Sequence, residues 1–343
     1  RKPQVKPRRV KTLQEYNMLD AVVEEETADI QHEITEATIL QREPSAKGDN
    51  DDQPILKVGD WMFCGNMGGW KHGDHYLSNS SVSFGTATDL SCNSEKVVVA
   101  MKRVSKDSDE ESVHMMQQEC RILQQLGNSH PHILGMIDHV DLPSEIVLLT
   151  AFAPAGDLSH CVPSGNCLAE CEARNLSQQL LSGLAYLQSS RIIHGDVKPQ
   201  NIFLTLLKNA YLAQLADFGL SEQVPAGKTS VAVAGVQGSY GFMPPEMIEA
   251  NEASFATDLF ALGVMLFRIL AAYDPFYPAS QVRDPLEFDP MCWSPLSLEA
   301  KRILEQLLAP RAEDRGGAKE LLESHPWLLA DKDALIGEEQ RDS

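Results

Sequence analysis

Hydrophobic and polar positions follow two different patterns along this chain. Between residues 56 and 105, short apolar runs rich in β-branched side chains predict strands, and "EKVVVAMKRV" is the clearest of them. The next segment, "DEESVHMMQQECRILQQLG", has helical periodicity and ends on glycine, so it predicts a helix. Two more strands are predicted at "ILGMIDHV" and "EIVLLTAFA". This part of the chain therefore predicts a small lobe built around a β-sheet.

From residue 157 onward the pattern becomes mainly helical. Four segments carry the apolar spacing of helices: "LSQQLLSGLAYLQ", "DLFALGVMLFRILAAY", "LSLEAKRILEQLLA" and "GAKELLESHPWLL". The chain is thus predicted to be an α+β protein, with a small β-rich lobe at residues 56–152 and a larger helical lobe at residues 153–330. We expect any site that both lobes share to lie in the cleft between them.

The two ends of the chain differ from this central part. In residues 12–43, apolar positions recur at three- and four-residue steps among many glutamates, which predicts an amphipathic helical extension packed on the main domain. The polar segment "PSAKGDNDDQP" then reads as a linker. We therefore place a basic tail, the extension and the linker in residues 1–55, and an acidic tail in residues 331–343.

Charge excludes one class of partner. The 343 residues carry a formal net charge of −20, and a surface so acidic repels nucleic acid and anionic lipid. The local exception is "RKPQVKPRRVK", whose six Lys or Arg residues favour a solvated tail, with a peripheral arm that docks on a membrane or partner as the alternative. No run of about eighteen apolar residues predicts a transmembrane segment.

The cysteines leave the compartment open. None of the seven forms a CxxC pair, which argues against structural zinc. Cys161, Cys167 and Cys171 lie close in sequence. Ordinary thiols are the favoured interpretation, and a disulfide among the three, which would imply an oxidising compartment, is the alternative.

The chemistry is concentrated in "HGDVKPQN", residues 194–201. This segment places an acid, a lysine and an amide on one short loop behind the apolar run "RII". One carboxylate, one cation and one amide are what a phosphoryl transfer needs at its centre.

The order of motifs around that loop resembles the protein kinase fold. "VAMK", then Glu119, "HGDVKPQN", "ADFG" and "PPE" follow one another from about residue 80 to residue 328, in the order of the kinase signature set. The resemblance implies a bilobal kinase fold and an ATP- and Mg²⁺-dependent reaction. It assigns Lys102 to the α- and β-phosphates and Glu119 to holding that lysine.

The same resemblance assigns roles at the reaction centre. It makes Asp196 the carboxylate that orients the substrate hydroxyl and accepts its proton, and Lys198 the cation beside the transferring phosphoryl group. Asn201 and Asp217 supply oxygen ligands of the kind Mg²⁺ prefers, and the strand hairpin predicted at "IFLTLLKNAYLAQLA" brings them together. Further residues expected around the nucleotide are Ala100, Thr150 at the gatekeeper position, Asp157 at the ribose, Phe203 and Gly85.

A later segment points to protein substrates. "GSYGFMPPE" resembles the stretch that cradles an acceptor peptide, and Ser239 lies where serine/threonine kinases place a small hydroxyl residue beside the catalytic groups. The resemblance implies an ion pair between Glu246 and Arg315 that ties this segment to the helical lobe. It also implies that Asp258 holds the backbone of the catalytic loop.

The first departure from the kinase pattern is Gly195. Most kinases carry arginine before the catalytic Asp, where it binds a phosphate on the activation loop, and glycine has no charge for that contact. We expect an activation loop that is ordered without phosphorylation. The hydroxyls of that loop that are candidates for phosphorylation are those of Thr229, Ser230 and Ser239.

The second departure is the phosphate-covering loop. Counting back from Lys102 places it at residues 80–87, "SSVSFGTA", where Ser80 and Val82 replace two of the three family glycines and Gly85 remains. This predicts weak, strongly metal-dependent nucleotide binding. The glycine-rich segment at residues 65–73 is interpreted as an ordinary turn or an insertion.

Together the two departures and the extension resemble the secreted rhoptry-type kinases of apicomplexan parasites, in the branch without a glycine loop. That resemblance implies a protein of a secretory organelle or parasitophorous vacuole; otherwise a cytoplasmic one is expected. The leading hypothesis is a serine/threonine protein kinase, since every group that touches phosphoryl transfer is present. A pseudokinase scaffold is the alternative, and a metabolite or lipid kinase is less favoured because "GSYGFMPPE" resembles a peptide-docking segment.

Overall fold

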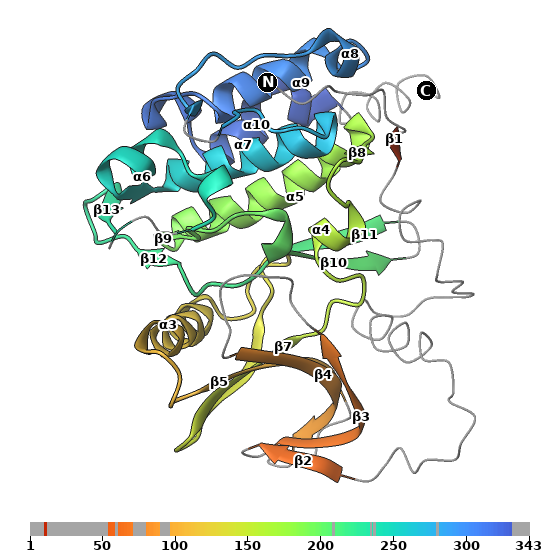
Figure 1. Ribbon diagram of the computed structural model, residues 1–343, viewed down its shortest axis with the longest axis vertical. Helices are drawn as coiled ribbons and strands as arrows, with labels where there is room; N and C mark the ends of the chain where they lie inside the picture. Colours follow the sequence, from red (N-terminus) through yellow and green to blue (C-terminus); the bar gives the residue numbers. More distant parts are fainter. Residues whose placement is uncertain are drawn as a thin grey trace, which may run out of the picture.

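The computed structural model describes residues 10–11, 54–58, 61–70, 80–89, 97–207, 210–233, 235, 238–278 and 281–330. The predicted extension at residues 12–43 and the acidic tail lie outside these ranges, as does the predicted linker except for its last residue, Pro54, which begins a strand. The predicted α+β architecture is confirmed, with a β-sheet in the N-terminal part and a mainly helical C-terminal part (Figure 1).

The small lobe is a six-stranded sheet in the order β2-β3-β4-β5-β7-β6, with every neighbouring pair antiparallel. Its strands are β2 (Pro54–Val58), β3 (Trp61–Trp70), β4 (Ser80–Asp89), β5 (Val97–Ser105), β6 (Met136–Asp141) and β7 (Glu145–Ala151). One helix, α3 (Glu110–Leu126), packs against β5, β6 and β7. Asp109 caps its first turn through Ser112 N at 2.7 Å, and Gly127 ends it with φ +59°.

The side chains of the central strands β5 and β7 alternate between the two faces of the sheet, and each face packs against its own buried cluster. Val99 and Met101 join Val147 and Leu149 in a cluster on one face of the sheet. On the other face, Val104 joins the large core that continues through α3 into the helical lobe. Lys102 shares the face of Val104, so its side chain is directed toward α3 and the lobe boundary.

The larger lobe is built around two long helices. Its helices are α4 (Leu158–Cys161), α5 (Glu170–Ser189), α6 (Pro245–Ala250), α7 (Phe255–Ala271), α8 (Pro290–Trp293), α9 (Leu298–Leu307) and α10 (Ala318–Ser324), with 3-10 turns η1 (Pro199–Asn201), η2 (Tyr240–Phe242) and η4 (Ala312–Arg315). Helix α7 is buried along nearly its whole length and packs between α5 and α9 (Figure 1). Ser254 caps it, accepting from Ala256 N at 3.2 Å while Thr257 Oγ1 accepts from Ser254 N. None of the helices in the described ranges is long and apolar enough to cross a membrane.

Short strand pairs fasten the loops of this lobe. They are β1 (Val10–Lys11) with β8 (Cys167–Leu168) in parallel, and three antiparallel pairs: β12 (Glu222–Gln223) with β9 (Ile192–Ile193), β10 (Ile202–Leu207) with β11 (Ala210–Leu215), and β13 (Ser230–Ala232) with β14 (Glu252–Ser254). The β10–β11 pair is the predicted hairpin, and its register starts with Ile202 opposite Leu215.

The predicted position of the phosphate-covering loop is wrong. Residues 80–87 lie in strand β4, with unbroken pairing from Ser80 opposite Val104 to Ala87 opposite Val97. Counting back from Lys102 assumes a fixed hairpin length, whereas the paired strands here extend back to Ser80. The residues between β3 and β4, 71–79, lie outside the described ranges.

Residues 65–73 are interpreted above as an ordinary turn or an insertion, and the turn is wrong for the described part, residues 65–70. Residues up to Trp70 belong to strand β3, and Gly68, Gly69 and Trp70 pair with Phe84, Ser83 and Val82. The register shifts between Cys64 and Gly68, so the glycines follow an irregularity in a strand.

The three clustered cysteines are thiols in the structure. Cys161 and Cys167 are buried and Cys171 is exposed. The favoured interpretation of ordinary thiols agrees with this, and the disulfide alternative does not.

Candidate active site

One carboxylate of helix α7 binds the backbone of the loop between β9 and β10. Asp258 accepts from His194 N through Oδ2 at 2.8 Å and from Gly195 N through Oδ1 at 2.9 Å. The side chain is buried, which raises the pKa of Asp258, while these two N–H donors act in the opposite direction. Asp258 thus makes the backbone contacts expected of it, and it fixes the residues that immediately precede Asp196.

Asp196 is the centre of a tightly connected polar group. Its Oδ1 accepts from Ser239 N at 3.1 Å and from Ser239 Oγ at 3.0 Å. Its Oδ2 lies 2.5 Å from Lys198 Nζ and accepts from Asn201 Nδ2 at 3.0 Å. Lys198 Nζ also donates to Ser239 Oγ at 2.9 Å. The structure therefore joins the predicted acid, cation and amide with the predicted hydroxyl.

A second charged group lies where the two lobes meet. Lys102 Nζ is 2.7 Å from Glu119 Oε2 and 3.1 Å from Asp217 Oδ1. Burial lowers the pKa of Lys102, but the carboxylates of Asp217 and Glu119 outweigh it and the pKa is raised. The ammonium therefore stays charged, and it connects strand β5, helix α3 and the segment after β11.

The pKa values of Glu119 and Asp217 are shifted in opposite directions, although both carboxylates lie beside Lys102. Burial raises the pKa of Glu119 and outweighs the attraction of Lys102. For Asp217 burial also acts upward, but Lys102 outweighs it and lowers the pKa to about 2. The same lysine thus pairs with one carboxylate whose pKa is raised and one whose pKa is lowered.

Asp217 has an unusual backbone conformation, with φ +64° in the left-handed region. The next residue fixes it, because Phe218 N donates to Glu119 Oε1 at 3.4 Å and the Phe218 ring packs on His194 at 4.9 Å between centroids. A strained residue held by its neighbours is a common feature of functional sites. The Phe218 contacts position the Asp217 carboxylate.

Asn201 and Asp217 fit the role of magnesium ligands. Ala216 N donates to Asn201 O at 2.9 Å, so the hairpin brings the two side chains to one place as predicted. Asn201 Nδ2 donates to Asp196 O and Oδ2, which leaves its amide oxygen for a cation. Among the described residues, no group of three or more His, Cys, Asp or Glu could hold a metal. Two oxygens alone suit Mg²⁺ that keeps water and phosphate ligands.

Residues 82–328 match the family model described as "Protein kinase domain". The chain belongs to the protein kinase domain family.

The relatives of this kinase are serine/threonine kinases. It is 26% identical over 238 residues to a calcium/calmodulin-dependent protein kinase type 1 of Macrobrachium nipponense, covering 67% of each chain. It is 29% identical over 241 residues to the type 1B enzyme of Rattus norvegicus, covering 68% of each. It is 28% identical over 242 residues to serine/threonine-protein kinase DCLK1 of the same organism, covering 68% of this chain and 54% of that protein. By family, the protein is an ATP-dependent serine/threonine protein kinase.

The residues expected around the nucleotide lie on both sides of the lobe boundary. Ala100 in β5 pairs with Thr150 in β7, and Asp157 forms a backbone bridge with Phe203 in β10. Asp157 also caps α4, its Oδ1 accepting from His160 N at 3.1 Å and from Ser159 Oγ at 2.5 Å. Contact of these four with ATP stays a prediction.

Gly85 is placed differently from expectation. It lies within strand β4 opposite Val99, so its backbone belongs to the sheet ladder. A role over the phosphates would require a loop at this point, and the described strand does not supply one.

The segment after Ser239 is tied to the helical lobe by the expected ion pair. Arg315 is fully buried and binds Glu246 with both Nη atoms, at 2.5 and 3.0 Å. Its guanidinium also donates to main-chain carbonyls, including Ala309 O at 2.9 Å, and lies over the Phe260 ring. A bidentate arginine with further acceptors is a rigid anchor.

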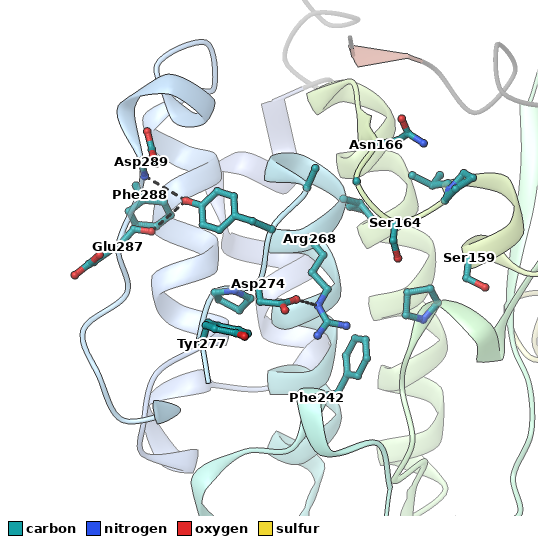
Figure 2. Close-up of a pocket in the computed structure, with 18 of the residues that line it drawn as sticks. Ser159, Ser164, Asn166, Phe242, Arg268, Asp274, Tyr277, Glu287, Phe288 and Asp289 are labelled. Carbon is teal, nitrogen blue, oxygen red and sulfur yellow. Dashed lines mark hydrogen bonds and ion pairs between the residues drawn. The ribbon is translucent and has the colours of Figure 1, made fainter. Parts of the chain in front are cut away.

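A large pocket of about 970 Å³ opens beside the catalytic loop of the kinase. Pro199 and Gln200 of that loop form part of its wall, and Phe242 of η2 forms another part. Figure 2 shows Arg268 in the middle, between the Phe242 ring and Asp274. Arg268 Nε lies 2.6 Å from Asp274 Oδ1, and its guanidinium carbon is 4.2 Å from the Phe242 ring centroid. The pocket therefore borders both the loop that carries Asp196 and the turn that follows Ser239.

Two residues that sequence reasoning missed hold the segment after Asp217. Gln118 Nε2 of α3 donates to Ser221 O at 2.7 Å, and both residues are buried. The side chain of Arg191, just before β9, donates to three main-chain carbonyls of the same segment. Because these acceptors are main-chain atoms, no residue type in the sequence marks them.

Proposed function

We propose that this kinase transfers the γ-phosphoryl group of ATP to serine or threonine hydroxyls of proteins, with Asp196 as the residue that receives the hydroxyl proton. The observation that carries the proposal is the joint contact of Asp196, Lys198 and Ser239. A carboxylate, an ammonium and a small hydroxyl lie within hydrogen-bond distance of one another, and Asp258 fixes the loop that carries the carboxylate and the ammonium.

The residues divide the reaction between them. Asp196 orients the acceptor hydroxyl and takes its proton as the new oxygen–phosphorus bond forms and the bond from the γ-phosphorus to the β,γ-bridging oxygen breaks. Lys198 offsets the negative charge of the group in transfer. Lys102, held by Glu119, binds the α- and β-phosphates.

The cofactor site is proposed at the same place. Asn201 and Asp217 would hold Mg²⁺, which, when bound with ATP, neutralises charge on the phosphates. Ala100, Thr150, Asp157 and Phe203 are proposed to surround the nucleoside. Residues 80–87 pair continuously with strand β5 and form no loop over the phosphates, so we propose that Lys102 and the metal carry more of the binding.

Transfer of labelled γ-phosphate to a generic protein tests this function. We compare the wild-type kinase with Asp217→Ser and with Asp284→Ser, the same change at an exposed surface aspartate. The wild type and Asp284→Ser should phosphorylate serine and threonine, and Asp217→Ser should fall to background while binding the substrate protein normally.

An ATP titration with and without Mg²⁺ supplies the second readout. We expect binding that is weak and markedly stronger with the metal. Nucleotide binding without any transfer by the wild type would contradict the proposal and favour the alternative of a pseudokinase scaffold.

We further propose a place in the rhoptry-type branch and secretion into a parasitophorous vacuole. The support is Gly195 and the single glycine in residues 71–79. Microscopy of the tagged full-length protein tests this, and a cytosolic signal would contradict it.

A further inference from the structure

Arg191 binds a stretch of main chain that lies 33 to 37 residues further along the sequence. Its Nε donates to Val224 O at 3.0 Å, and its Nη2 donates to Pro225 O at 2.5 Å and to Lys228 O at 2.6 Å. In the opposite direction, Val224 N donates to Arg191 O at 2.8 Å. One side chain therefore fixes a whole turn, residues 224–228.

The backbone of Arg191 is strained in a way that this contact explains. Its φ is +59°, in the left-handed region that favours glycine. An arginine persists in such a conformation only where its surroundings hold it. The surroundings here are the three carbonyls, which accept from Nε and Nη2 of the guanidinium.

The bound turn belongs to the segment that leads from Asp217 to Ser239. Further along, strand β13 pairs with β14, and Ser230 Oγ donates to Glu252 Oε1. Val231 and Val233 pack against a small buried cluster formed by Ile193, Val224 and Ala253. In the described part of this segment, Arg191 therefore holds residues 224–228 through their carbonyls. Strand pairing and apolar packing hold residues 230–233.

Gly195 stands at the position where most kinases carry an arginine that binds a phosphate on the activation loop. Gly195 has φ +81°, and a β-carbon added there would lie 2.6 Å from Leu220 O. The backbone of the segment itself thus occupies the space that a side chain at residue 195 would need. Arg191, four residues earlier in the sequence, directs its Nε and Nη2 donors at main-chain carbonyls.

We propose that Arg191 is a positioning residue that orders the activation segment through main-chain carbonyls, so that the kinase holds this segment in place without phosphorylation. The proposal depends on the proposed kinase function for its activity readout only. Its structural content, the order of residues 220–233, is measured separately.

One rival arrangement has to be distinguished. Arg121 and His114 of α3 both act electrostatically on Glu222 in β12, at the start of the same segment. The rival arrangement is a segment that a phosphate on Thr229 or Ser230 orders in place of Arg191. The unphosphorylated protein therefore decides the question.

Hydrogen exchange of the peptide that spans residues 220–233 is the test. It is run on phosphatase-treated wild type and on Arg191→Ala, Arg191→Lys and Arg302→Ala, the last being an arginine paired with Glu299 on the surface of α9. We expect the wild type and Arg302→Ala to be equally protected. Arg191→Ala should exchange about tenfold faster or more, with Arg191→Lys between them because an ammonium cannot span three carbonyls.

Activity supplies the second readout. Arg191→Ala should lower kcat/KM for a protein substrate about 10- to 100-fold, with the KM for ATP nearly unchanged, because the segment cradles the acceptor and not the nucleotide. Arg191→Lys should recover part of this loss.

Two results would overturn the proposal. One is equal exchange in Arg191→Ala and wild type. The other is a wild-type segment that is protected only when Thr229 or Ser230 is phosphorylated, which would assign the ordering to the phosphate. A wild type without transfer activity, but with exchange that depends on Arg191, would support the proposal and reject the proposed function.

Discussion

Ser239 donates both its backbone N–H and its hydroxyl to the same oxygen of Asp196, at 3.1 and 3.0 Å. The two residues are 43 positions apart, so this contact joins the segment around Ser239 to the loop that carries Asp196. Asp196 is thereby oriented before any substrate arrives, which lowers the cost of reaching the reactive geometry.

The first prediction concerns this carboxylate. Asp196→Asn keeps the shape of the side chain and removes the proton acceptor, so we expect kcat for γ-phosphate transfer to fall about 10²- to 10⁴-fold with little change in Tm. Ser239→Ala keeps the backbone contact with Asp196, so its kcat should fall less. Wild-type turnover by Asp196→Asn would exclude Asp196 as the base.

The second prediction concerns the lobe boundary. Lys102→Met leaves Glu119, which is 4% exposed, without its cation, and we expect the free energy of unfolding to fall by about 3 kcal/mol along with loss of transfer. Adding Glu119→Gln should restore much of the stability but no activity. Denaturant titration measures both variants, and equal stability of the single and double variants would contradict the prediction.

The third prediction is a pH dependence away from the active site. Glu170 accepts from Ser297 N at 2.8 Å, from Ser297 Oγ at 2.6 Å and from Trp327 Nε1 at 2.9 Å. Burial raises the pKa of Glu170, but these donors and Arg174 outweigh it, and the pKa lies below its ordinary value of 4.5. The carboxylate therefore stabilises the fold above pH 4.5, and this contribution is lost as the pH falls through the lowered pKa.

Glu170→Gln tests that dependence. At neutral pH the variant should be less stable than the wild type by about 1.5–3 kcal/mol, and the difference should shrink as the pH falls below 4.5. Glu305→Gln, an exposed change on α9, should show no such difference. A gap that stays constant down to low pH would contradict the assignment.

The fourth prediction concerns the pocket in Figure 2. Arg268→Ala removes the cation that packs on Phe242, close to Ser239, so the acceptor segment loses support. We expect the KM for a protein substrate to rise about tenfold, which corresponds to about 1.4 kcal/mol, while the KM for ATP stays the same. Arg283→Ala, which breaks an exposed pair with Glu249, is the matched control. Parallel changes in both KM values would show that Arg268 supports the whole lobe instead.

The sequence was most informative where the chemistry lies within short, continuous segments. Asp196, Lys198 and Asn201 share one loop, and a strand hairpin of ordinary length returns the chain to Asp217. Lys102 and Glu119 lie on a strand and on the helix that follows it, so their meeting at 2.7 Å also follows from regular elements. Residue type and spacing were sufficient for these groups because few geometries satisfy them.

Sequence reasoning failed where the outcome depended on hairpin length or on main-chain atoms. The phosphate-covering loop was misplaced because the pairing of β4 with β5 extends to Ser80. Asp157 was expected at the ribose, and its role as the cap of α4 was not foreseen. Arg191 was missed because its three partners are carbonyls, which every residue possesses.

The close approach of Leu220 O to Gly195 also bears on the history of this kinase. A single replacement of Gly195 by arginine would not recreate a phosphate-responsive switch, because the side chain would first collide with the peptide behind it. Regaining the switch would require the backbone at Leu220 to move and Arg191 to release its turn in the same lineage. A change at residue 195 alone is therefore insufficient to restore this form of control.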